Sequence, residues 1–352
     1  MNQLQSMLEQ ALGALELPEG LTEEQIDDLV SQVSDEWMRS VSNDLYDDLM
    51  VRADEMLAED RRDISAFERR NRRRWKKPVD LLRVMVRIVQ ETISTSFIEG
   101  DVGERDTYSF DALNRLCVRS LMVAREVICL VEGGFADGAL GRWRSLHEMA
   151  VSAAFIAHHG ELTAERFVAS FSFASKKAIL QLNNYAARAN LEPFSADELQ
   201  AAADLCENIE ARLGKGLGDD YGWARLALGF ELNRKPHLLH LEEDTGLDHW
   251  RPRYRWASQN VHSNYAPPMA SLGMAESNAE VHLVGQSNSG MVDPLQMSAV
   301  SLLIAATAFL GRFPNADRIV IGRVLEQISD QVGDVALTAE AESAARAATR
   351  KR

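Results

Sequence analysis

The chain is poor in cysteine and has no cysteine pair spaced for a disulfide framework or a zinc site. Its 352 residues include only Cys117, Cys129 and Cys206, and none of them forms a C-x-x-C pair. Small extracellular domains depend on closely spaced, even-numbered cysteines. We therefore expect a protein of a reducing compartment, namely the bacterial cytoplasm.

Segments that target a chain or anchor it in a membrane are also lacking. The start, MNQLQSMLEQALGALELPEG, has neither the basic nor the apolar region of a secretory signal. The longest apolar run, residues 297–311 (MSAVSLLIAATAFLG), is shorter than the roughly 20 residues that span a bilayer. We expect this run to be a buried core helix, and we expect no membrane partner.

Sequence motifs for nucleotide hydrolysis and ester hydrolysis are absent. The chain contains no G-x-x-x-x-G-K-[ST] or G-x-G-x-x-G phosphate loop, and no G-x-S-x-G nucleophile elbow. His237 and His240 stand three apart before an acidic run, but no H-E-x-x-H or repeated E-x-x-H accompanies them. His158 and His159 end a predicted helix, where histidines commonly bond the last carbonyls. We expect no metal and no cofactor.

Positive charge is scarce overall but concentrated in one segment. The net charge is −15, and residues 1–60 hold 16 acidic and two basic side chains. Residues 61–77 (RRDISAFERRNRRRWKK) hold nine basic and two acidic ones. A solvated or internally paired helix is the simpler interpretation of this basic run, and a nucleic-acid contact is the alternative.

Most of the chain shows helical periodicity. After Pro78, which is well placed to open a helix, apolar residues recur at intervals of three and four through Ile93. The same pattern predicts helices over residues 22–60, 108–132, 136–158 and 161–189. A capping box at 195–198 opens a further helix that runs to about residue 213, and two more helices begin at about residues 295 and 316.

These helices predict an all-α protein, a helical bundle core with an N-terminal helical appendage. We expect the appendage over residues 1–77, the core over 78–330, and a helical or frayed tail over 331–352. Strand signals are sparse, because only residues 279–286 (AEVHLVGQ) alternate weakly. The fold therefore has at most one small β-hairpin.

Two polar clusters interrupt the predicted helices. In residues 254–265 (YRWASQNVHSNY), Arg255, Ser258 and His262 share one helix face because seven residues make nearly two turns. In residues 142–148 (RWRSLHE), Arg144 and Glu148 stand at i and i+4 in an otherwise apolar helix. Charges there must pair or face a polar cavity. We expect either an internal ion pair or one pocket, whose further lining residues are His147, Tyr254 and Asn260.

The motifs R-S-L-x-E at 144–148 and, about a hundred residues later, Y-x-x-x-S-x-x-x-H at 254–262 resemble a family of bacterial helical proteins. This family is domain of unknown function 5677, and the resemblance covers residues 80–315. It implies an all-helical fold and no particular activity.

Arg255-x6-His262 is also similar to the R-x4–6-H signature of the HEPN superfamily of helical ribonucleases, found in toxin–antitoxin and phage-defence systems. This resemblance implies a metal-independent endoribonuclease with RNA as partner and a site at a homodimer interface. His262 is then general base or acid toward the ribose 2′-OH, and Arg255 stabilises the phosphorane charge, with Ser258 beside them. Trp256 departs from the signature, which usually has a polar residue after the arginine.

Two non-enzymatic interpretations stand beside the ribonuclease. In the first, the protein is a sensor or interaction module in which Arg144 and Arg255 bind an anionic ligand or a partner protein. Trp143 and Trp256 would supply apolar walls. In the second, the polar residues form a purely structural network that locks the bundle.

Overall fold

The computed structural model describes residues 3–18, 20–99, 107–261, 267, 270–277 and 281–350. It is 81% helical, with ten α-helices and no strand within these residues, which confirms the predicted all-α class. No strand occurs at 281–286, and positions 279 and 280 of the predicted hairpin lie outside the described residues. The chain divides into two units, Met1–Phe67 and Glu68–Arg352, and each is described by itself.

The unit Met1–Phe67 is helical but has no core. It contains helix α1 (Gln3–Gly13) and the first part of helix α2 (Glu23–Glu99). None of its described residues is buried, and large apolar side chains such as Tyr46 and Val51 are exposed. Burial of apolar surface therefore contributes little to the stability of this unit.

Helix α2 continues through Pro78, where the sequence indicated a helix start. A proline inside a helix removes one hydrogen bond and costs about 3 kcal/mol. The neighbouring Trp75, Val79 and Leu82 are at most 2% exposed, and each such side chain contributes about 1.5–3 kcal/mol when buried. Packing thus outweighs the proline, and the boundary expected after residue 77 falls inside one helix.

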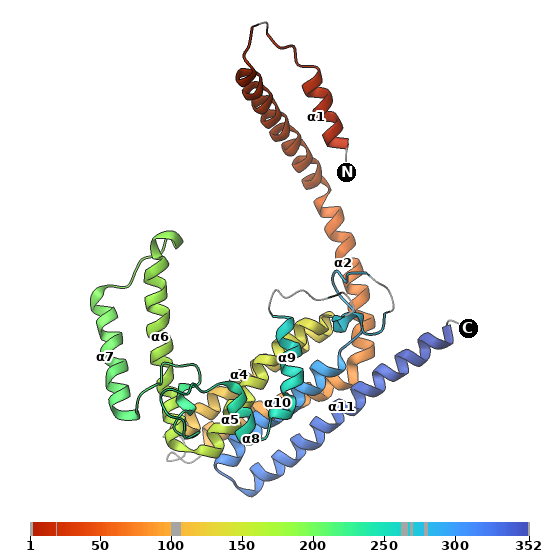
Figure 1. The fold of residues 1–352 in the computed structure, drawn as a ribbon. Coiled ribbons are helices and arrows are strands. Elements are labelled where there is room, and N and C mark those ends of the chain that lie inside the picture. Colours follow the sequence, from red (N-terminus) through yellow and green to blue (C-terminus); the bar gives the residue numbers. More distant parts are fainter. Residues whose placement is uncertain are drawn as a thin grey trace. The chain divides into compact units, whose positions relative to one another are not determined.

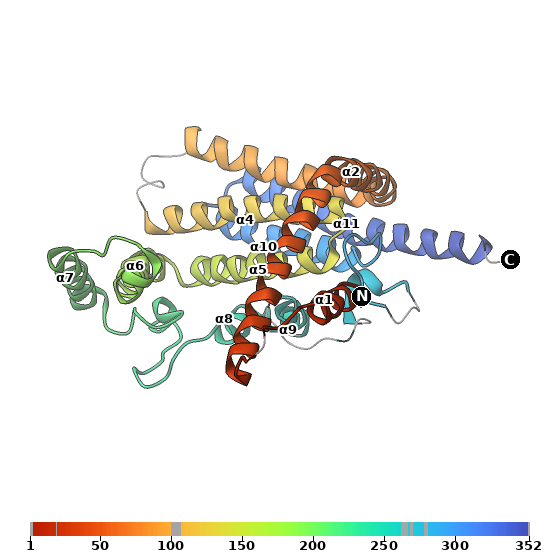
Figure 2. The ribbon, with the colours of Figure 1, turned by 90° about the horizontal axis from the view of Figure 1, so that it is seen from above.

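Three long helices form the centre of the unit Glu68–Arg352. They are α4 (Tyr108–Gly133), α5 (Ala136–His159) and α10 (Val292–Arg312), which pack against one another in both ribbon views (Figures 1 and 2). Helix α4 is capped by Gly134, whose φ of 87° favours glycine and lets α5 begin two residues later. The C-terminal part of α2 joins this core through Trp75 and Leu82.

Helix α10 contains the longest apolar run and is a core helix, as predicted. Among the described helices it alone is long and apolar enough to cross a membrane. However, 61% of its apolar 18-residue stretch is buried inside the protein. It packs against α4, α5 and helix α11 (Ala316–Arg350). Val332 and Ala336 of α11 are fully buried, so the tail expected from residue 331 begins inside a packed helix.

A helix pair extends from the end of α5 (Figure 1). Helices α6 (Glu161–Ala189) and α7 (Ala196–Leu213) pack together, and the predicted capping box opens α7. Ser195 Oγ accepts from Glu198 N, and Ser195 N donates to Glu198 Oε2 at 2.8 Å. The buried Arg166 ties α6 to the segment after α7 by donating to the carbonyls of Leu213, Gly222 and Trp223.

Short helices complete the unit and position the polar residues. Helix α8 (Leu238–Thr245) and helix α9 (Arg251–Gln259) both pack against α5. Within the described part of the chain, three 3-10 turns connect the longer elements: η1 (Gly222–Ala224), η2 (Asp248–Trp250) and η4 (Leu272–Met274). Pro252 in the first turn of α9 has no amide hydrogen to satisfy, which suits a helix start.

Candidate functional site

A buried ion network joins α5, α8 and α9. His147 Nε2 and Glu242 Oε1 are 2.9 Å apart, and Arg251 Nη1 donates to Glu242 Oε2 at 2.7 Å. The side chains of His147 and Glu242 are 1% and 0% exposed. A buried carboxylate is tolerated only when it is paired, and here both oxygens of Glu242 have a partner. Both carboxylate oxygens are therefore satisfied, although Arg251 Nε is buried without a hydrogen-bond partner among the described residues. The network holds the two short helices on α5.

Arg144, Glu148 and Tyr254 form a second contact between α5 and α9. Arg144 Nε lies 3.1 Å from Glu148 Oε1, and the Tyr254 hydroxyl donates to the same oxygen at 2.5 Å. The Arg144 guanidinium also lies 4.9 Å from the centre of the Tyr254 ring. The pair expected between Arg144 and Glu148 is therefore present, and Tyr254 completes it.

Ionisation equilibria at this contact follow from its burial. Burial raises the pKa of Tyr254 to about 12, and its hydrogen bond to the Glu148 carboxylate adds to the shift. Burial alone would lower the pKa of Arg144, but contacts with Tyr254 and Glu148 more than offset this and raise it. Burial also raises the pKa of Tyr221, and the negative charge of Glu148 reinforces that shift. The phenols stay protonated and Arg144 stays charged at neutral pH.

Sequence reasoning missed three members of this cluster: Tyr221, Glu242 and Arg251. Glu242 lies in the acidic run after His240, which indicated only a weak metal site. Arg251 and Tyr221 lie outside the apolar helices whose interruption revealed the other residues. His147 and Glu242 are 95 positions apart in sequence, and Arg251 is nine positions from Glu242 in a different helix, so no helical spacing could have identified these contacts.

The remaining residues predicted on α9 have different environments. Arg255 and Asn260 are exposed, and Arg255 has no hydrogen bond or ion pair within the part of the chain that the structure describes. Ser258 is half-buried and donates to the Tyr254 carbonyl at 2.8 Å within its own helix. His262 lies outside the described residues. The structure thus gathers the buried His147 and Tyr254 with the half-buried Arg144 and Glu148, and leaves Arg255 on the surface.

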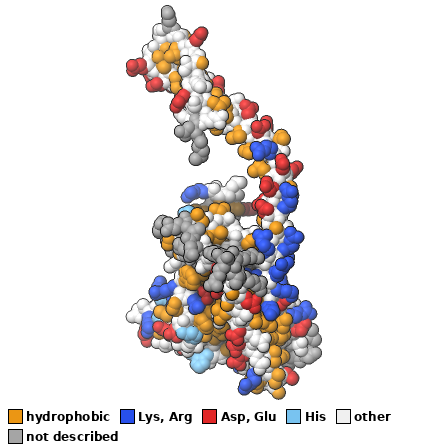
Figure 3. Space-filling model, turned by 90° about the vertical axis from the view of Figure 1, so that its right-hand side faces the viewer, with side chains coloured by type: hydrophobic (Ala, Val, Ile, Leu, Met, Phe, Trp, Pro, Cys, Tyr) orange, Lys and Arg blue, Asp and Glu red, His pale blue; other side chains and the backbone are white. Residues whose placement is uncertain are grey.

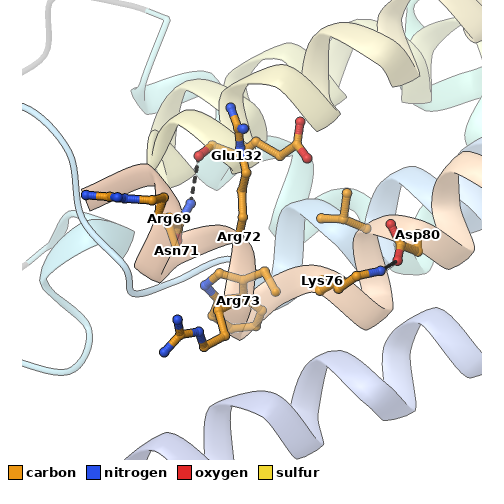
Figure 4. Close-up of a pocket in the computed structure, with 9 residues that line it drawn as sticks. Arg69, Asn71, Arg72, Arg73, Lys76, Asp80 and Glu132 are labelled. Carbon is orange, nitrogen blue, oxygen red and sulfur yellow. Dashed lines mark hydrogen bonds and ion pairs between the residues drawn. The ribbon is translucent and has the colours of Figure 1, made fainter. Parts of the chain in front are cut away.

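A basic groove lies between α2 and α4 in the unit that begins at Glu68. We use this name for two neighbouring cavities, of about 370 and 490 Å³, which share Glu132 in their linings. The first is shown in Figure 4. The cationic residues lining the groove are Arg69, Arg72, Arg73, Lys76, Arg83, Arg87 and Arg125, and the acidic ones are Asp80 and Glu132.

Two buried residues of α2 fix the orientation of the groove's cations. Asn71 Nδ2 donates to the carbonyls of Val131 and Glu132 at 2.7 and 2.9 Å, which anchors α2 on the end of α4. Trp75, one turn later, is 1% exposed and donates to Asn288 Oδ1 at 3.1 Å. Because this face of α2 is buried, the intervening Arg72 and Arg73 point outward, as Figure 4 shows.

Acidic side chains compensate only part of the positive charge. Arg83 makes two hydrogen bonds to Glu132, at 2.8 and 2.7 Å, and the pKa of Arg83 is raised chiefly by this contact. Other cations pair along their own helix, Arg72 with Glu68 and Lys76 with Asp80. Within the described residues Arg69 and Arg73 have no acidic partner. Lys and Arg side chains accordingly gather along α2 in Figure 3.

Comparisons with known proteins assign no activity to this fold. No curated protein and no solved structure matches the chain. One family model matches a continuous part of the chain, from α4 to α9, which is shorter than the range of 80–315 expected from the resemblance. The matched part includes the motif at 144–148 and the one at 254–262. Residues 110–279 match the model of the Family of unknown function (DUF5677), the family that these motifs resemble.

Proposed function

We propose that the protein binds RNA and cleaves it without a metal, as a HEPN-like endoribonuclease of a bacterial defence or toxin-type system. The observation that carries the RNA-binding part is the basic groove. Seven cationic and two acidic side chains line it, on a chain whose net charge is −15. A local surface of this sign on an acidic protein favours a polyanionic partner.

The length of the groove favours a polymer over a small anion. Arg69 and Arg87 are 18 positions apart on α2, or about 27 Å at 1.5 Å per residue. At roughly 3.4 Å per step of a stacked strand, this distance corresponds to about eight nucleotides. A free phosphate would instead need several cations converging on one point. Cations along a helix match the repeated phosphates of a nucleic-acid strand.

The cleavage step rests on Arg255 and His262. Arg255 is exposed and has no anionic partner in the described residues, so its planar guanidinium is free to bind a phosphate. The contacts of Tyr254 with Glu148 of α5 and of Arg251 with Glu242 of α8 hold α9 in place, with Arg255 exposed. His262 lies outside the described residues, and its role here rests on its spacing from Arg255.

In the proposed reaction His262 removes the proton of a ribose 2′-hydroxyl. The 2′-oxygen attacks phosphorus, and the bond to the 5′-oxygen breaks with protonation of the leaving group. The products are a 2′,3′-cyclic phosphate and a 5′-hydroxyl, and Arg255 stabilises the charge that develops on the phosphorane. HEPN-like catalysis further implies that two copies of the chain form the site as a homodimer.

Binding is tested by the salt dependence of affinity for a labelled single-stranded RNA. We compare wild type, the double variant Arg69→Gln/Arg73→Gln, and the control Arg188→Gln/Arg323→Gln, which removes two exposed arginines outside the groove. Each phosphate contact on a single strand contributes about −0.7 to the slope of log K against log salt. The groove variant should therefore bind more weakly with a slope shallower by about 1.4, while the control resembles wild type. Equal slopes for all three proteins would contradict the proposal.

Cleavage is tested separately, in EDTA, by analysing the ends of the RNA products. His262→Ala should lower the rate by a factor of about 10²–10⁴ without weakening RNA binding. His249→Ala, which changes an exposed histidine of the neighbouring η2 turn, serves as the control. Arg255→Lys should also be impaired because a point charge does not reproduce a planar fork. Diverse RNAs left intact by the wild type would refute the enzymatic part.

RNA binding without cleavage would favour the interaction module instead. In that case the ligand contacts would lie in the groove, because Arg144 already has Glu148 and Tyr254 as partners. A ligand that displaced Glu148 from Arg144 would leave a half-buried carboxylate without its counter-charge, with only the Tyr254 hydroxyl as partner, which costs about 1–3 kcal/mol.

A further inference from the structure

The C-terminal turns of α5 and α8 bring two histidines and an aspartate together. They are His158 and His159 of α5 and Asp244 of α8, each of which can offer one ligand atom. These ligand atoms all lie within 4.8 Å of one another. The sequence indicated that the two histidines bond the last carbonyls of α5. Instead, His159 Nε2 lies 2.8 Å from Asp244 Oδ1, and the amide of Gly160 bonds the carbonyl of Ile156.

We propose that His158, His159 and Asp244 bind a divalent transition-metal ion, with Zn²⁺ as the ion of choice. Imidazole and carboxylate ligands suit Zn²⁺, and three protein ligands leave one position for water. The ion would join the end of α5 to the end of α8. This site goes beyond the proposed RNA cleavage and does not depend on it.

The ligand geometry is close to what Zn²⁺ requires. Metal–ligand bonds of about 2.0–2.1 Å in a tetrahedral site place ligand atoms about 3.3 Å apart. His159 and Asp244 are already closer than this, so they need only move apart slightly as the ion enters. His158 is exposed, and a rotation of its side chain can close the remaining distance without a backbone change.

An aromatic contact restricts the His159 ring. The His159 ring centre lies 4.3 Å from that of Phe155, which is fully buried and cannot move aside. The His158 ring lies 4.8 Å from His159 and nearly perpendicular to it, at 87°. A ring whose orientation is already restricted loses less entropy when it binds a metal. At natural metal sites, contacts with neighbouring groups orient the ligand rings in the same way.

Helix electrostatics also favour a cation at this position. His158 and His159 lie in the last turn of α5, and Asp244 is the penultimate residue of α8. The C-terminus of a helix carries a partial negative charge of roughly half an elementary charge. Two such ends and one carboxylate therefore surround the site. His158 and Asp244 are exposed and His159 is partly so, which lets an ion enter from solvent.

The site shares no residue with the pair proposed for RNA cleavage, because its ligands lie on α5 and α8 whereas Arg255 lies on α9. The groove residues lie on α2 and α4. Loss of the metal should therefore leave RNA binding unchanged, so either proposal can fail without the other.

Zn²⁺ titration of the full chain without a histidine tag tests the proposal. By calorimetry the wild type should bind one Zn²⁺ at this site, and Zn²⁺ should raise its melting temperature. The variants His158→Ala, His159→Ala and Asp244→Asn should each lower the affinity more than about tenfold. The control His237→Ala/His240→Ala removes the other closely spaced histidines and should bind like wild type.

Circular dichroism confirms that each variant is folded before titration. Cobalt provides a second readout, because Co²⁺ bound by these ligands absorbs visible light in a way that depends on its geometry. The wild type and the control should give this absorption, and His158→Ala should not. Zn²⁺ affinities that agree between the wild type and all three ligand variants would overturn the proposal.

Discussion

Replacement of Glu242 by alanine should destabilise the protein more than any single surface change. Glu242 is 0% exposed and accepts from both His147 and Arg251. The substitution leaves the buried N–H of His147 unsatisfied, at a cost of about 1–3 kcal/mol. It also removes the partner of Arg251 and opens a cavity. Loss of one member of a buried ion pair costs about 3–5 kcal/mol in total, which we expect here.

Urea denaturation of the full chain, followed by circular dichroism, measures this loss. The control is Glu243→Ala, because Glu243 is the next residue of α8 but is exposed, and its loss should change the free energy of unfolding by about 0.5 kcal/mol or less. If the free energy of unfolding of Glu242→Ala lies within about 1 kcal/mol of that of the control, the view that this carboxylate holds α8 and α9 on α5 is refuted.

Three further predictions concern titration, thiol reactivity and domain structure. Burial raises the pKa of Tyr254 in the folded protein to about 12 from its usual value of 10.0. The stability that the protonated phenol contributes is therefore fully present below pH 10 and is lost between pH 10 and 12. Denaturation across that range should show a steeper loss for the wild type than for Tyr254→Phe, by an amount on the order of 2–3 kcal/mol, and parallel curves would refute this. Cys129 is exposed, whereas burial raises the pKa of Cys117 to about 12; mass spectrometry should find that alkylation of the native protein modifies Cys129 quickly and Cys117 only after unfolding. A chain of residues 68–352 should fold, whereas a chain that begins at residue 78 should be less stable because it lacks the buried Asn71 and Trp75; thermal denaturation of the two compares them, and equal stability would mean that these residues do not support the core.

Helical periodicity predicted the fold because each core helix buries one face along its own length. The ends of α4, α5 and α6 lie within two residues of the predicted ends, at Gly133, His159 and Ala189. Glycines and a left-handed Asn190 follow these helices, so the chain itself encodes where they stop. Pro78 misled the prediction because tertiary burial around it was not visible locally.

Contacts between distant residues set the limit of sequence reasoning at the site. Arg144 and Glu148 could be paired from their spacing alone, since they occupy adjacent turns of α5. The partners of His147 and Asp244, by contrast, depend on how α8 packs against α5, which no local pattern specifies. The basic run was visible in the sequence, but burial of Asn71 is what shows which of its cations face solvent.

Alkylation of Cys129 in the presence of RNA tests the central claim most directly. Cys129 is exposed and lines the basic groove, so a strand that occupies the groove must cover it. Single-stranded RNA at low salt should slow the alkylation of Cys129 in the wild type, and high salt should restore the rate as the phosphate contacts weaken. RNA that binds the protein while Cys129 reacts at its unprotected rate would place the strand elsewhere and contradict the account.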